Sequence, residues 1–379
     1  MRDVLVIGGG VVGCAVALAA LRRGLSVEVL ERNEVTHVGP APLPGPEGSA
    51  AAAGIVGAQL EGLHGDGPLS RLCLQSRDLY PRFVEGLFDL TGIDVELRPV
   101  GVSRVVTDGP ALDTLLHDVA WQERAGLRVE RLDAKRAREV EPALSPEVRG
   151  GVRFPDDPRI DPPKLLAAVR AAVLASGGSI RAKSPARRVL VREGKAAGVA
   201  LDDGTEIFAP AVVVSAGSWS ALIEESALPE GSIQPARGQI LELFTDAPIL
   251  RGVVEGPDCY LSPRDDGRIL LGSTIEMVGY RPGATAGGAS RLLAAALRLV
   301  PALEGATLRR AWAGLRPYTA DEKPVIGKTE IPGLIAATGH FRNGVLLSPL
   351  TGEIVAALLT GAAPPVDLRP FLPARLAQR

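Results

Sequence analysis

Hydrophobic residues form short uninterrupted runs at three places in the chain, whereas much of residues 233–316 alternates between apolar and polar positions. Val4–Ile7, Ala211–Ser215 and Leu334–Ala337 are such runs, and each is followed by glycine or other small residues. This pattern predicts fully buried strands, as in a parallel sheet that is covered on both faces. Cys14–Arg23 is rich in Ala and Leu and stops at Gly24, which predicts a helix with a glycine C-cap.

Periodic segments continue through most of the remaining chain. Ser26–Leu30 predicts a second strand, which completes a βαβ unit with a right-handed crossover. The proline- and glycine-rich segment Val35–Gly48 predicts a loop. Further helices are expected at Ser49–Gly54, Leu69–Leu90, Lys164–Ser176 with Asp161 as N-cap, Arg291–Val300 and Leu350–Leu359. Strands are expected at Gly101–Thr107, in a hairpin over Arg187–Asp202, and through much of residues 233–316.

The length of the chain and the order of these segments predict two domains. A chain of 379 residues is longer than one hydrophobic core usually serves. Its β-rich middle lies between two α/β pieces, so we predict an α/β protein in which an antiparallel β-sheet domain is inserted into a Rossmann-type domain. The predicted nucleotide-binding domain comprises residues 1–85, 151–222 and 323–379, and the predicted substrate domain comprises 86–150 and 223–322.

The first βαβ unit carries a glycine motif with acidic residue Glu31 at the end of its second strand. In this motif Gly8 permits a tight turn, Gly10 lets the backbone approach a pyrophosphate, and Gly13 lets helix and strand pack closely. The N-terminus of the helix offers N–H groups to phosphates, and Glu31 can accept hydrogen bonds from a ribose. A glycine-rich loop without a ligand is the alternative, but the complete strand–helix–strand–acid context favours dinucleotide binding.

Two other glycine turns follow predicted strands. Gly217 lies just after Ala211–Ser215, where a small turn lets another segment approach a cofactor. Residues 337–345 join the last strand to the last helix, and their N–H groups could stabilise negative charge on a cofactor. Each turn, taken alone, is equally compatible with an ordinary connection.

Arg316 and Tyr260 are candidates for contact with a substrate. Arg316 follows an apolar, strand-like segment, and a guanidinium on a rigid element is well suited to binding a carboxylate. Tyr260, on another predicted strand, could place its phenol over a small pocket. The alternatives are a surface arginine and a tyrosine in the core between strands.

Composition and charge exclude several kinds of protein. The formal net charge is -2 and the basic residues are scattered, which argues against nucleic acid or an anionic membrane as a partner. The three cysteines and four histidines show no metal-ligand spacing, so we predict no metal site. Sparse cysteines favour a reducing compartment, and a strand that begins at Val4 leaves no room for a leader, so we expect a cytoplasmic protein.

Together these motifs resemble the glycine oxidase branch of the D-amino-acid-oxidase superfamily, nearly end to end from Val4 to Leu359. The resemblance implies an FAD-binding Rossmann-type domain and a substrate domain. It implies that Arg316 binds the substrate carboxylate, that Tyr260 lies near that carboxylate, and that Arg342 lies beside flavin and substrate. The FAD contacts that motif and resemblance together predict are Gly8, Gly10, Val11, Val12, Gly13, Glu31, Arg32, Ser49, Ala50, Ala53, Gly54, Ile55, Gly217, His340, Phe341, Arg342, Asn343, Gly344, Val345 and Leu346.

The resemblance also implies a reaction. A small amino acid or amine (glycine, sarcosine or a small D-amino acid) would lose hydride from Cα to flavin N5. The products would be imine or keto acid, ammonia and, with molecular oxygen as acceptor, hydrogen peroxide. Thiamine thiazole biosynthesis is the implied pathway, and a homo-oligomer is the implied assembly. The alternatives are a D-amino-acid dehydrogenase that reduces a quinone or partner protein, and a flavin-binding subunit without its own chemistry.

Three features of this chain qualify the resemblance. The stretch from Trp312 to Lys323 lacks the cysteine that anchors flavin covalently in monomeric sarcosine oxidases, so non-covalent FAD is expected. Ile275 replaces a methionine of the glycine oxidase pocket, which leaves the preferred substrate open. The loop between Glu31 and Ser49 is longer than in that enzyme.

Overall fold

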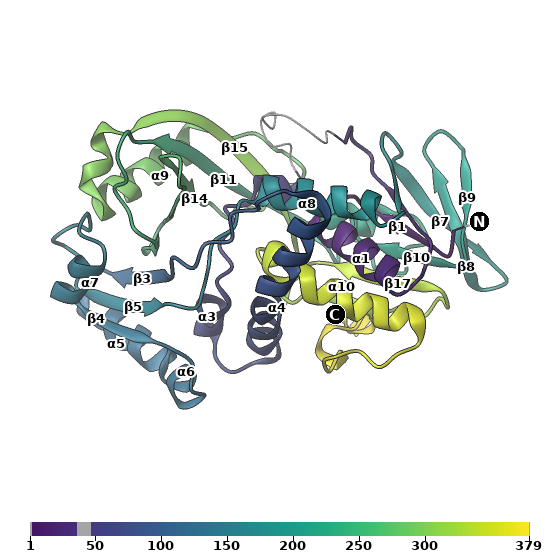
Figure 1. Ribbon diagram of the computed structural model, residues 1–379, viewed down its shortest axis with the longest axis horizontal. Coiled ribbons are helices and arrows are strands. Elements are labelled where there is room, and N and C mark those ends of the chain that lie inside the picture. Colours follow the sequence, from purple (N-terminus) through teal and green to yellow (C-terminus); the bar gives the residue numbers. More distant parts are fainter. Residues whose placement is uncertain (1, 36–46, 379) are drawn as a thin grey trace.

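The computed structural model describes residues 2–35 and 47–378, and its two large β-sheets lie in different parts of the molecule (Figure 1). The six-stranded sheet has the strand order β16-β17-β10-β1-β2-β6. Its strands are β1 (Val4–Ile7), β2 (Val27–Leu30), β6 (Ser179–Arg181), β10 (Ala211–Val214), β16 (Val325–Lys328) and β17 (Leu334–Thr338). Neighbouring strands are parallel except β16 and β17, so the predicted buried runs do form the centre of a parallel sheet.

Each face of this sheet contributes to a separate core, as the alternation of side chains in a strand requires. Val4 and Val6 of β1 pack with helices on one face, whereas Leu5 and Ile7 pack against a small sheet on the other. The helices are α1 (Val11–Arg22), α4 (Pro68–Thr91), α8 (Pro162–Ala175) and α10 (Gly344–Thr360), and the small sheet comprises β7 (Ala186–Arg192), β8 (Lys195–Leu201) and β9 (Glu206–Phe208). None of the helices described is long and apolar enough to cross a membrane.

The eight-stranded sheet has the order β15-β11-β14-β13-β12-β3-β5-β4. Its strands are β3 (Val102–Val106), β4 (Glu130–Asp133), β5 (Gly150–Phe154), β11 (Gln234–Phe244), β12 (Val253–Glu255), β13 (Tyr260–Pro263), β14 (Arg268–Gly272) and β15 (Thr307–Tyr318). The pairs are antiparallel, as predicted, except for the parallel pair β3–β12. The predicted domain border at residue 151 falls inside β5, whose hydrogen bonds to β3 and β4 place it in this sheet.

Helices surround the eight-stranded sheet at its edges and on one face (Figure 1). They are α5 (Gly109–Asp118), α6 (Ala120–Arg124), α7 (Ala134–Val140) and α9 (Ala286–Leu299). Leu241 of β11 and Leu271 of β14 pack with Leu292 of α9 on that face. On the opposite face of the same strands, Ile240 and Leu270 pack with Ala51 of α2.

Two predicted helices have different limits in the structure. The helix expected at Ser49–Gly54 is only α2 (Gly48–Ala51), because Ala52 is extended and Gly54 has a left-handed φ of +72°. The helix expected from Leu350 begins at Gly344 and contains Pro349. Proline cannot donate to the carbonyl of Val345, but that carbonyl accepts hydrogen bonds from Tyr80 and Ser348 instead.

Candidate functional site

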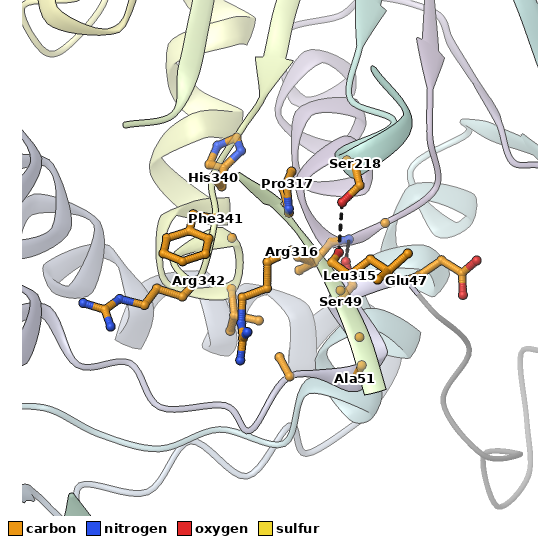
Figure 2. Close-up of a pocket in the computed structure, with 18 of the residues that line it drawn as sticks. Glu47, Ser49, Ala51, Ser218, Leu315, Arg316, Pro317, His340, Phe341 and Arg342 are labelled. Carbon is orange, nitrogen blue, oxygen red and sulfur yellow. Dashed lines mark hydrogen bonds between the residues drawn. The ribbon is translucent and has the colours of Figure 1, made fainter. Parts of the chain in front are cut away.

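A pocket of about 770 Å³ is lined by residues of both large sheets. This volume lies within the range of about 300–1,000 Å³ that is typical of ligand sites. At one end it is bordered by the β1–α1 loop and the end of β2, and at the other by β11, β13 and β15. Figure 2 shows part of its wall, formed by α2, β15 and the segment that precedes α10.

The β1–α1 loop is packed so tightly that its glycines have no room for a side chain. A Cβ on Gly8, whose φ is +106°, would lie 2.5 Å from the carbonyl oxygen of Ser215. A Cβ on Gly13 would lie 2.0 Å from the carbonyl oxygen of Gly8. The loop therefore holds β1, α1 and β10 close together, and the N–H groups at the start of α1 border the pocket.

Glu31 lies at the end of β2 with a buried side chain. Its carboxylate accepts hydrogen bonds from the backbone N–H groups of Gly9 at 2.8 Å and Asn33 at 2.9 Å. Each carboxylate oxygen can accept a second hydrogen bond, so Glu31 retains acceptors for a ribose hydroxyl. The carboxylate is thus held in place by the backbone on the wall of the pocket.

Ser49 of α2 closes the pocket against the first turn of α1. Its hydroxyl accepts a hydrogen bond from the N–H of Val11 at 3.0 Å. A Cβ on Gly10 would lie 3.0 Å from the same hydroxyl. A helix N-terminus, glycines that permit close approach and a fixed carboxylate are the groups that a dinucleotide requires, so the residues present fit FAD.

Arg32 forms part of a stack of side chains at the nucleotide end of the pocket. Its guanidinium carbon lies 3.6 Å from the ring centroid of Trp219, and its Nη2 lies 2.6 Å from Glu47 Oε1. Trp219 in turn contacts Tyr280, with ring centroids 5.6 Å apart. Arg32 therefore lines the pocket and also holds Trp219 and Glu47 in place beside it. The sequence did not predict this second, structural role.

Arg316 enters the pocket from β15 at the opposite end, and Figure 2 shows its side chain extending away from the strand. Its Nη1 donates to the carbonyl oxygen of Thr274 at 3.0 Å and its Nη2 donates to Ser273 Oγ at 2.6 Å. Burial lowers the pKa of Arg316, although the group stays charged at neutral pH. No carboxylate within the described residues forms an ion pair with it. A half-buried cation on a pocket wall, without a counter-ion among these residues, can bind an anionic ligand.

Two glycines on neighbouring strands make room for the side chains at this end. A Cβ on Gly238 of β11 would lie 2.2 Å from Arg316 Nη1, and a Cβ on Gly272 of β14 would lie 2.4 Å from Tyr260 Oη. Gly238 pairs with Gly314, two residues before Arg316 on β15. No local sequence pattern indicates the role of these glycines, because their effect depends on the register between distant strands.

Tyr260 of β13 lies both in the core and on the pocket wall, the two positions that the sequence left open. It packs against the cluster that includes Ile240 and Trp312, yet it also lines the pocket. Burial raises the pKa of Tyr260, so its phenol is protonated at neutral pH and can donate a hydrogen bond.

Arg342 lies on the pocket wall, paired with an acidic residue. Its Nε lies 2.9 Å from Glu61 Oε1, and Asn343 Nδ2 donates to the other oxygen of that carboxylate at 3.2 Å. Burial opposes the charge on Arg342, but Glu61 and two further carboxylates outweigh it and raise its pKa. Figure 2 shows the Arg342 side chain directed to one side, away from that of Arg316.

His340 and Phe341 line the pocket in the segment that precedes α10. The His340 ring is buried, and its Nε2 lies 3.0 Å from Thr351 Oγ1 of α10. Burial lowers the pKa of His340 to about 3, so the ring is neutral. Phe341 has a left-handed φ of +48°, and its N–H donates to the carbonyl of Pro317 at 2.9 Å. This conformation links the segment before α10 to β15.

Most of the site residues predicted from the sequence lie together around this pocket. Gly13 does not line it, because it faces Gly8; Leu346 points into the helical core, and Ala50 packs against that core. The predicted loop Val35–Gly48 falls largely on residues 36–46, outside the described residues. The predicted residues that line the pocket are Gly8, Gly10, Val11, Val12, Glu31, Arg32, Ser49, Ala53, Gly54, Ile55, Gly217, Tyr260, Arg316, His340, Phe341, Arg342, Asn343, Gly344 and Val345.

The region of this chain that matches known proteins includes both large sheets. The model of the DAO family, described as FAD dependent oxidoreductase, matches residues 3–358. Glycine oxidase from Geobacillus kaustophilus is 34% identical over 373 residues, which are 97% of this chain and 96% of that protein. The bifunctional protein ThiO/ThiG from a Synechocystis species is 35% identical over 364 residues, 94% of this chain but 51% of that longer protein. The crystal structure of the Geobacillus kaustophilus glycine oxidase has a TM-score of 0.91 at 33% identity and covers 98% of each chain. The predicted fold class is thereby confirmed.

Proposed function

Because the chain belongs to the DAO family of FAD-dependent oxidoreductases and uses FAD, we propose that it oxidises glycine or another small amino acid or amine at the Cα–N bond. The observation that carries this proposal is the charge of Arg316, which is half-buried on the pocket wall and has no carboxylate partner among the described residues. The carboxylate of an amino acid would supply the missing counter-ion. Sarcosine and small D-amino acids share that group and remain candidate substrates.

In this proposal the chain acts mainly by positioning. Arg316 binds the carboxylate with its remaining N–H groups, and Tyr260 donates its phenol hydrogen to the same carboxylate. Holding the substrate at one end fixes Cα relative to the cofactor, which is where such a site gains most of its rate. Bound FAD would supply the two-electron acceptor, and with oxygen as final acceptor the electrons would end in hydrogen peroxide. Oxidation of the Cα–N bond gives an imine at Cα, which water hydrolyses to a keto acid and ammonia.

The Arg342–Glu61 pair lies on the same pocket wall and would border the substrate. We place the product imine in thiamine thiazole biosynthesis, the context that the similarity to a ThiO/ThiG protein favours. We propose the division into an FAD-binding and a substrate-binding domain with the border moved to follow Phe154.

Non-covalent FAD remains a prediction, which acid release of the flavin would check. A homo-oligomer is a second prediction, which light scattering would check. A cytoplasmic location is a third prediction.

The test is a peroxide-coupled assay with glycine, sarcosine, D-alanine and ethylamine, which has no carboxylate. We expect peroxide from one or more of the amino acids and little from ethylamine. Anaerobic mixing then separates the alternatives: a subunit without chemistry would leave the flavin oxidised, and a dehydrogenase would be reduced but would react slowly with readmitted oxygen. Equal turnover of ethylamine and glycine would contradict the role of Arg316.

A further inference from the structure

Ser273 lies between the two side chains that the proposed function assigns to the substrate carboxylate. It follows the last residue of β14 and lines the pocket. Arg316 Nη2 donates to its hydroxyl oxygen at 2.6 Å. Tyr260 Oη lies against Gly272, the residue that precedes Ser273, since a Cβ on that glycine would be only 2.4 Å from the phenol oxygen. Tyr260 and Ser273 both line the pocket at this point.

The direction of these hydrogen bonds follows from the chemistry of the three groups. A guanidinium can only donate, so the Ser273 oxygen must be the acceptor of the bond from Arg316. The single proton of the Ser273 hydroxyl is then free for another acceptor, and the Tyr260 oxygen, which lies against the preceding Gly272, is an acceptor at this end of the pocket. A phenol oxygen that accepted this proton would direct its own proton elsewhere, and Tyr260 borders the pocket. Such a chain of donors would run from Arg316 through Ser273 to Tyr260 and into the pocket.

We propose that Ser273 is a positioning residue for the substrate carboxylate: its hydroxyl holds Arg316 in place and directs the phenol proton of Tyr260 toward the same carboxylate. This inference rests on the proposed function. It adds a residue that makes no contact with the reacting atoms and acts through two that bind the substrate. Thr274 cannot replace it, because its carbonyl oxygen accepts from Arg316 Nη1 but has no proton to pass on to Tyr260.

Loss of the Ser273 hydroxyl should weaken carboxylate binding without disturbing the fold or the cofactor. Arg316 would keep one tether, to Thr274, while the Tyr260 hydroxyl would lose the donor that fixes its orientation. Because hydrogen bonds that involve a charged group are the stronger ones, we expect a loss of about tenfold in affinity for a carboxylate. The loss should appear in KM more than in kcat.

The experiment measures the Kd of acetate, a carboxylate that cannot be oxidised at a Cα–N bond, from the change in the flavin absorption spectrum. Ser273→Ala should raise this Kd about tenfold, and Ser273→Thr, which keeps a hydroxyl, should restore most of the affinity. Ser70→Ala is the control, because Ser70 is a buried serine whose hydroxyl donates one hydrogen bond, to the carbonyl of Gly65, and it lies outside the pocket. It should leave the Kd unchanged, and all variants should retain FAD and their melting temperature.

A double-mutant cycle distinguishes positioning through Tyr260 from a general loss of structure. In the Tyr260→Phe background, Ser273→Ala should raise the Kd of acetate by a clearly smaller factor than in the wild type, because the acceptor of its proton is already gone. An unchanged Kd in Ser273→Ala, or the same factor in both backgrounds, would overturn the proposal while leaving the oxidase assignment intact. A wild-type protein that neither binds acetate nor oxidises an amino acid would overturn both.

Discussion

The two ends of the pocket are built by different means. At the nucleotide end, backbone meets backbone: Gly8, Gly13 and the strand end at Ser215 approach so closely that no Cβ fits. At the substrate end, side chains with charge or hydroxyl groups project from separate strands, and Gly238 and Gly272 leave space for them. Where backbone packs against backbone, an added side-chain atom would force the strands and helix apart. Where side chains form the site, one functional group can be removed while the backbone keeps its structure. The same kind of substitution should therefore have different consequences at the two ends.

The largest effect is expected from Gly13→Ala. The new methyl group would lie 2.0 Å from the carbonyl oxygen of Gly8 and 2.5 Å from Ser215 Oγ, so β1 and α1 would have to separate. We expect a loss of roughly 3 kcal/mol or more in the free energy of unfolding, measured by urea denaturation. Gly10→Ala is the matched control: its methyl group meets only the Ser49 hydroxyl at 3.0 Å, so this protein should fold but bind FAD weakly. Equal stability of both variants would remove the distinction between the two glycines.

A smaller, more selective effect is expected from Gly238→Ala. Its methyl group would lie 2.2 Å from the Arg316 guanidinium, which must move, while the backbone of β11 is undisturbed. We expect normal FAD content and a drop of about a hundredfold in kcat/KM for the preferred amino acid, because misplacing a bound substrate by about 1 Å has that cost. Gly287→Ala serves as control, since its methyl group would meet only the flexible end of Arg291 at 3.5 Å. A Gly238→Ala enzyme that lost FAD instead would show that the two ends are not independent.

The same difference explains how much the sequence could predict. The glycine motif, α1 and Glu31 are contiguous in the chain, so their pattern predicted both their structure and their ligand. The sequence predicted Arg316 and Tyr260 as separate site residues. Their contacts with Gly238 and Ser273 depend on the register between strands, and no local sequence pattern determines that register.

The limits of two helices were missed for similar reasons. Pro349 argues against a helix that starts at Gly344, unless one knows that Tyr80 of distant α4 bonds to the freed carbonyl of Val345. The end of α2 is set by Gly54, whose carbonyl accepts a hydrogen bond from the N–H of Ile160 at 2.8 Å. In both cases a contact between segments far apart in the chain overrides the local preference.

Near neutral pH the smallest effect comes from His340, through the pH dependence of the free energy of unfolding. His340 has a pKa of about 3 in the folded protein, below its ordinary value of 6.5, so acid protonates the unfolded chain first. Stability should therefore fall as the pH drops from 6.5 toward 3, by up to about 1.4 kcal/mol per pH unit from this group. Urea unfolding of His340→Asn across this range should show a shallower decline than the wild type. Identical slopes would mean that the buried ring takes up a proton in the folded state.

The central claim is that Arg316 is the counter-ion of an amino-acid carboxylate beside FAD. Anaerobic stopped-flow reduction of the flavin tests it most directly, with glycine or whichever amino acid the assay panel favours, in the wild type and in Arg316→Ala. We predict that the variant retains FAD, that its second-order rate of reduction falls by at least about tenfold, and that Arg316→Lys recovers only part of the loss. The slow reduction by ethylamine should be the same in all three proteins. If Arg316→Ala were reduced by the amino acid as fast as the wild type, the carboxylate would bind elsewhere and the account would be wrong.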